Sequence, residues 1–96
     1  MSLHCEVLLA SHKLELAGHR QFSAERLAVT CYENDRSKFG LRDYELTYPD
    51  VTKVYISLMG YRGLVARRLL EKVGPKKYSL SVTGRDVAKR ILSGAT

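Results

Sequence analysis

The sequence predicts a single small α+β domain, mainly helical, in which three helices precede a β-hairpin and one helix follows it. Three observations lead to this prediction. Apolar residues recur at helical spacing in three stretches of the first 60 residues. Two runs with strand-like alternation flank Gly74-Pro75, a pair that favours a turn because proline lacks the amide proton that a ladder needs. Another helical stretch with its own capping residue follows the second run.

The first helix is predicted over about residues 3–17 and the second over about residues 23–33. In the first, a stripe of apolar positions runs to Ala17, and Gly18 supplies a stop. In the second, Ser23 is placed to cap the free amides, with Phe22 and Leu27 at the positions of a hydrophobic staple. Residues 34–49 then lack clear periodicity and predict a loop or irregular turn. Its apolar side chains are expected to pack down onto the core: Phe39, Leu41, Tyr44 and Tyr48.

The third helix is predicted over about residues 50–59, with Asp50 as its cap. Its spacing predicts a core-facing stripe of Val51, Val54, Tyr55, Leu58 and Met59. The same spacing leaves a solvent-facing side that consists of Thr52, Lys53, Ile56 and Ser57.

A hairpin is predicted over about residues 68–82 and a last helix over about residues 84–93, capped by Thr83. The inward positions of the hairpin are expected to be Leu70, Tyr78, Leu80 and Val82. The core-facing positions of the last helix are expected to be Val87, Ala88, Ile91 and Leu92.

Positive charge is concentrated in the second half of the chain, whose formal total is +6. Residues 1–50 contain six Lys or Arg and eight Asp or Glu, whereas residues 51–96 contain ten and two. Clustered cations gain free energy by releasing counterions from a phosphate backbone. The second half therefore predicts a polyanionic partner.

The order of three helices, two strands and one helix, with a basic turn between the strands, resembles the winged helix-turn-helix superfamily. Residues 70–75 (LEKVGP) and 78–85 (YSLSVTGR) look like the wing and following helix of many bacterial and archaeal repressors. Residues 22–25, 39–42, 48–50 and 59–60 extend the likeness to small prokaryotic winged-helix proteins of uncharacterised role. This resemblance implies sequence-dependent binding of double-stranded DNA by a transcriptional regulator or an accessory DNA-binding protein.

In the docking geometry of that superfamily, the third helix enters the major groove and the wing meets phosphates. The predicted base-edge contacts are Thr52, Lys53 and Ser57. The predicted phosphate contacts are Tyr61, Arg62, Arg67, Lys76, Lys77 and Arg85. Plainer roles stay open, because Lys53 and Ser57 also suit a solvated helix face, and arginines also form surface ion pairs.

The connection over residues 34–49 is longer than the turn of an ordinary helix-turn-helix. If it covers the third helix, the groove-facing surface is blocked, and a protein-interaction adaptor that uses this connection is favoured instead. A homodimer is also left open, through the last helix or through Leu8, Leu9 and Leu16 of the first helix.

Other function classes are disfavoured. Three scattered histidines form no nucleophilic constellation, and Gly60-Tyr61-Arg62-Gly63 lacks the lysine of a phosphate-binding loop, so we predict no enzyme and no cofactor. Cys5, His12 and His19 fall seven apart, but no second Cys/His pair completes a zinc shell, so we predict no metal site. Isolated cysteines, with neither a membrane-length apolar run nor a leader, predict a cytoplasmic protein without membrane contact.

Overall fold

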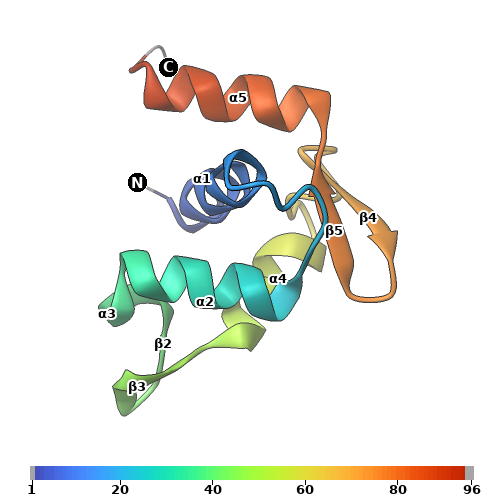
Figure 1. The fold of residues 1–96 in the computed structure, drawn as a ribbon. Coiled ribbons are helices and arrows are strands. Elements are labelled where there is room, and N and C mark those ends of the chain that lie inside the picture. The colour runs from blue at the N-terminus through green and yellow to red at the C-terminus, as the bar shows by residue number, and fades with distance from the viewer. Residues whose placement is uncertain (1, 95–96) are drawn as a thin grey trace.

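The chain is α+β and mainly helical, with its helices arranged around α1 (Figure 1). A computed structural model describes residues 2–94. Within that range the helices are α1 (Leu3–Leu16), α2 (Ala24–Asn34), α3 (Arg36–Phe39), α4 (Val51–Met59) and α5 (Val82–Leu92). The strands are β1 (Phe22–Ser23), β2 (Gly40–Leu41), β3 (Tyr44–Pro49), β4 (Leu70–Gly74) and β5 (Lys77–Leu80). Helix α1 lies between α2 and α5, and it also contacts α4 (Figure 1).

The larger sheet has three antiparallel strands in the order β1-β5-β4. Tyr78 at its centre pairs with Phe22 on one side and with Lys72 on the other. Leu70, Tyr78 and Leu80 are all buried, which confirms their predicted inward position. Strand β1 was not predicted, because two residues carry no strand pattern of their own and become a strand only by pairing with β5.

Among the four predicted helices, the starts were predicted correctly except at α5. Ser23 accepts from the backbone N–H of Arg26 at 3.1 Å, and Asp50 accepts from that of Lys53 at 3.1 Å, as expected of caps. The cap of α5 is Ser81 rather than Thr83, since Ser81 Oγ accepts from the N–H of Gly84 at 2.9 Å. Strand β5 consequently ends at Leu80, and the residue predicted to be its inward end, Val82, is 70% exposed.

The connection between α2 and α4 is ordered into α3 and a two-stranded pairing of β2 with β3, which corrects the predicted loop. Asp35 starts α3 by accepting from the N–H of Lys38 at 3.2 Å. Of the four side chains expected to pack on the core, Phe39 is buried, whereas Leu41, Tyr44 and Tyr48 are exposed. The base of this segment is therefore part of the core and its far end projects from the surface (Figure 1).

The core gathers residues from every helix and from the three-stranded sheet. Its largest fully buried side chains include Phe39, Leu8, Leu27, Leu58 and Tyr78. Both cysteines are free thiols, and Cys31 is buried, which raises the pKa of its thiol to about 12. No helix within residues 2–94 is both long and apolar enough to cross a bilayer.

Candidate nucleic-acid interface

A shallow hollow lies where the start of α4 meets the tip of the β4–β5 hairpin. Its lining consists of Ala24, Glu25, Val51, Thr52, Tyr55 and Lys76. The first two residues of α2 and the first two of α4 thus share one hollow with a hairpin lysine. Two of the residues predicted for nucleic-acid contact, Thr52 and Lys76, are brought together here from positions 24 residues apart.

The hairpin presents three exposed lysines: Lys72, Lys76 and Lys77. Lys77 pairs with Ser23, so the hairpin tip lies beside the cap of α2. Lys72 is the cross-strand partner of Tyr78 and therefore lies on the Tyr78 face of the sheet, whereas Lys77, next to Tyr78 in β5, lies on the other face. Lys72 was not among the predicted contacts. A register shift between Lys72 and Gly74 makes Tyr78 its partner, whereas regular pairing back from Gly74–Lys77 would have given Ser79.

The hydroxyl of Tyr78 lies buried behind this surface without a hydrogen-bond partner among the described residues. Burial raises the pKa of Tyr78, and the neighbouring Tyr55 and Glu25 raise it further. Because Tyr55 and Glu25 both line the hollow, the sheet, α2 and α4 meet at one place. The candidate surface is thus built on three packed elements rather than on a single mobile hairpin.

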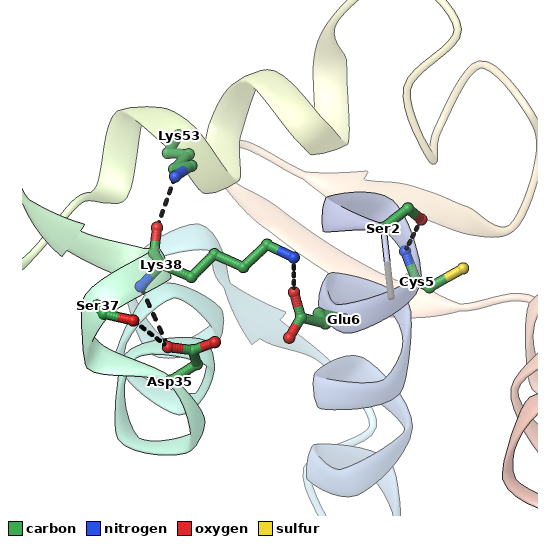
Figure 2. A network of polar contacts seen from close by, with 7 residues as sticks. All are labelled: Ser2, Cys5, Glu6, Asp35, Ser37, Lys38 and Lys53. Atoms are coloured by element: carbon green, nitrogen blue, oxygen red, sulfur yellow. Dashed lines mark hydrogen bonds and ion pairs between the residues drawn. The ribbon is translucent and has the colours of Figure 1, made fainter.

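Lys53 does not point to this hollow, because it ties α4 to α3 (Figure 2). Its ammonium donates to the carbonyl oxygen of Lys38 at 2.6 Å. The ammonium of Lys38 in turn pairs with Glu6 of α1. Asp35 fixes the start of α3 by accepting from the backbone N–H of Lys38 and from the hydroxyl of Ser37. The connection over residues 34–49 therefore contacts the Lys53 side of α4, whereas Thr52, Tyr55 and Ile56 stay exposed.

The prediction that Ser57 faces solvent is wrong. Ser57 is fully buried, and its hydroxyl shares a hydrogen bond of 2.6 Å with Nδ1 of His4. Helix α4 contacts both α1 and α2, so its buried face is wider than the single stripe inferred from the sequence. Ser57 lies on that face beside Val54 and Leu58. A buried hydroxyl cannot reach a base edge.

Four predicted phosphate contacts lie away from the hollow. Tyr61 is 92% exposed, and the guanidinium of Arg62 lies 5.4 Å from the centre of its ring. Arg67 lines a separate cleft between α1 and α5. Arg85 donates to both carboxylate oxygens of Glu15, at 2.6 and 2.8 Å. The hydrogen bonds from Arg85 lower the pKa of Glu15, so this arginine is held in an ion pair with α1.

Apolar side chains are also exposed near this surface. On α4 they are Tyr55, Ile56 and Met59. On the segment that carries β2 and β3 they are Leu41, Tyr44, Leu46 and Tyr48. The rings of Tyr44 and Tyr48 lie 6.1 Å apart. Between these two tyrosines the pairing is irregular, since Gly40 pairs with Pro49 and the next residue, Leu41, pairs with Tyr44.

Within residues 2–94 there is no group of three His, Cys, Asp or Glu that could hold a metal ion. No protein-family model, no curated protein and no solved structure matches the chain.

Proposed function

We propose that the chain is a winged-helix domain that binds double-stranded DNA, with α4 as its recognition helix and the β4–β5 hairpin as its wing. The observation that carries this proposal is the shared hollow of Thr52 and Lys76. The element order and the strand order β1-β5-β4 support it, since the hairpin directly follows α4 and packs back against the start of α2. A transcriptional regulator or an accessory DNA-binding protein in the cytoplasm fits this activity.

The chemistry of the surface divides into two parts. Lys76 and Lys77 supply cations for phosphate oxygens, and these contacts position the domain on the duplex without reading its sequence. Thr52 supplies a hydroxyl for a base edge, and Ile56 supplies an apolar side chain that suits a thymine methyl group. Tyr61 and Arg62 remain phosphate candidates at the end of α4.

Four of the originally predicted residues are left out of this surface. Lys53 and Arg85 are engaged in intramolecular contacts, and Ser57 is buried. Arg67 lines the cleft between α1 and α5. The proposed reading of bases therefore rests on Thr52 and Ile56.

The second candidate function is a protein-interaction adaptor. The exposed apolar side chains Tyr44, Leu46 and Tyr48 favour it, because a protein partner would bury them whereas DNA would not. The two functions differ in their response to salt. Phosphate contacts weaken steeply with salt, and an apolar protein contact does not.

The test is a salt titration of binding to a random duplex, measured by fluorescence anisotropy. The variant Lys76→Ala/Lys77→Ala should reduce the slope of log K against log salt by about two, since each phosphate contact contributes roughly 0.9. The matched control is Lys89→Ala/Arg90→Ala, which removes two exposed cations from the last turn of α5. An equal change of slope in both variants, or a binding constant that does not vary with salt, would reject the hairpin as the phosphate contact.

Base reading is tested separately. Thr52→Val removes the hydroxyl and keeps the shape of the side chain, so selection from a random duplex pool should give an altered preference. Discrimination at the affected position should change by about 1 kcal/mol or more. Equal losses on every duplex would assign Thr52 a role in positioning only.

A further inference from the structure

An apolar cleft of about 300 Å³ lies between α1, the segment that joins α4 to β4, and α5. Its apolar lining consists of Leu8, Leu64, Leu69, Val87 and Ile91. Leu8 and Leu64 are almost fully buried and form the floor, whereas the other three are half-buried and form the walls. The cleft shares no lining residue with the hollow of the candidate nucleic-acid interface.

The polar rim of the cleft is cationic. Arg67 is exposed and takes part in neither of the ion pairs recorded within residues 2–94. His4 also lines the cleft, and its Nδ1 is already hydrogen-bonded to Ser57, which leaves Nε2 as the remaining ring nitrogen. No aspartate or glutamate is part of the lining. A ligand group placed at this rim therefore meets one fixed positive charge and no negative one.

From this arrangement, we propose that the cleft binds a small carboxylic acid with an apolar body. The carboxylate lies against the guanidinium of Arg67, whose planar fork matches a carboxylate with two hydrogen bonds. The apolar body lies on Leu8 and Leu64, between the side chains of α5 and the linking segment. An apolar pocket with a few convergent polar groups is the usual form of a small-molecule site.

The size of the cleft favours a small molecule over a protein segment. A volume of about 300 Å³ is at the lower end of the range for small-molecule sites. A partner helix with its side chains is about 10 Å across and would need a long open groove. The rim charge then selects an acid over a neutral molecule of the same shape.

A ligand bound in the cleft would also be linked to the recognition surface through the residues that connect the cleft with α4. Arg67 and Leu69 belong to the segment that joins α4 to β4, and His4 holds Ser57 of α4. The proposal concerns binding of the acid alone, so it is tested without DNA, and its outcome does not depend on the proposed DNA-binding function.

The experiment uses octanoate as the probe and 1-octanol as its uncharged counterpart, titrated into the full chain and followed by amide chemical shifts. Octanoate should shift amides in the first half of α1, in residues 64–69 and in α5, and it should bind at least tenfold more tightly than octanol. The variant Arg67→Gln should weaken octanoate at least tenfold and leave octanol unchanged. Arg62→Gln, which removes an exposed arginine outside the cleft, is the matched control and should change neither.

Three outcomes would overturn the proposal. They are an absence of shifts around the cleft, equal affinity for octanoate and octanol, and equal weakening by Arg67→Gln and Arg62→Gln. The comparison of the two probes on the unmodified chain needs no variant, so it holds whatever happens to the folding of Arg67→Gln.

Discussion

The molecule projects two hairpin-like segments, and they differ in charge, in packing and in the partner that each suits (Figure 1). The β4–β5 hairpin presents three exposed lysines and one exposed glutamate, Glu71. Residues 40–49 present one arginine, two acidic residues and a set of exposed apolar side chains. The first segment suits a polyanion, and the second suits a protein surface.

Their attachment to the core differs as well. Strand β5 is the central strand of the larger sheet and buries Tyr78 and Leu80 along its length. The β2–β3 segment is joined to the core at its base, by Phe39, and its two recorded strand pairs leave residues 45–48 without a partner in β2. The basic hairpin is therefore packed on the core along β5, whereas the β2–β3 segment is anchored at one end.

The largest expected effect comes from removing the anchor of the β2–β3 segment. Phe39→Ala should lower the free energy of unfolding by about 3 to 5 kcal/mol, because Phe39 is 1% exposed and the substitution leaves a cavity. Leu46→Ala, at the projecting end of the same segment, should change it by less than about 0.5 kcal/mol, because Leu46 is 82% exposed. Urea denaturation followed by circular dichroism measures both. Similar losses for the two variants would mean that the projecting end is also packed.

The next effect concerns the base of the basic hairpin, where α5 crosses close to the chain that enters β4. A side-chain carbon at Gly84 would overlap the carbonyl oxygen of Leu69. Gly84→Ala should therefore lower the free energy of unfolding by about 1 to 3 kcal/mol, because backbone must move to admit the methyl group. Gly74→Ala is the matched control, since the nearest atom to its added carbon is Lys77 Cβ at an ordinary 3.9 Å. An equal response of the two variants to thermal unfolding would contradict the close approach.

A smaller effect is expected where α3, which leads into the β2–β3 segment, is tied to α4. Lys53→Ala removes the hydrogen bond to the carbonyl of Lys38 and should lower the free energy of unfolding by about 1 kcal/mol. Because Lys53 lies outside the proposed DNA-binding surface, its removal should leave the preference among duplexes unchanged. The control Thr52→Ala should alter sequence preference with little loss of stability, since Thr52 is exposed. A changed preference in Lys53→Ala would restore Lys53 as a base reader.

The parts of this fold that sequence reasoning predicted are those that local patterns determine. The apolar stripe of α2, the caps Ser23 and Asp50, and the inward hairpin residues Leu70, Tyr78 and Leu80 depend on neighbours within a few positions. Features that need distant partners were missed. Strand β1 exists through its pairing with β5, and the buried Ser57 depends on a partner 53 residues away in the chain.

The residues of the candidate site fall into the same two groups, those that a local pattern identifies and those that depend on a distant partner. Lys76 and Lys77 were predicted from a turn and are exposed, as a hairpin tip requires. Lys53 and Arg85 were predicted from the docking geometry of the winged-helix superfamily, and that geometry does not reveal an intramolecular partner. The acceptor for Arg85 lies 70 residues earlier in the chain, so no local pattern could have identified it.

The smallest expected effect is the pH dependence that this distant pair confers. The pKa of Glu15 is lowered in the folded chain, chiefly by its hydrogen bonds with Arg85, so the folded state binds its proton less readily than the unfolded state does. The resulting stabilisation is present above the ordinary pKa of 4.5 and is lost as the pH falls through the lowered folded value. The melting temperature of Glu15→Gln should therefore lie slightly below that of the unmodified chain at pH 7, and the two should converge at pH 3. Glu33→Gln, which removes an exposed carboxylate of α2, should show no such convergence. A constant difference between Glu15→Gln and the unmodified chain across this range would mean that Arg85 is not held by Glu15 in solution, and Arg85 would then return to the cations available for phosphate.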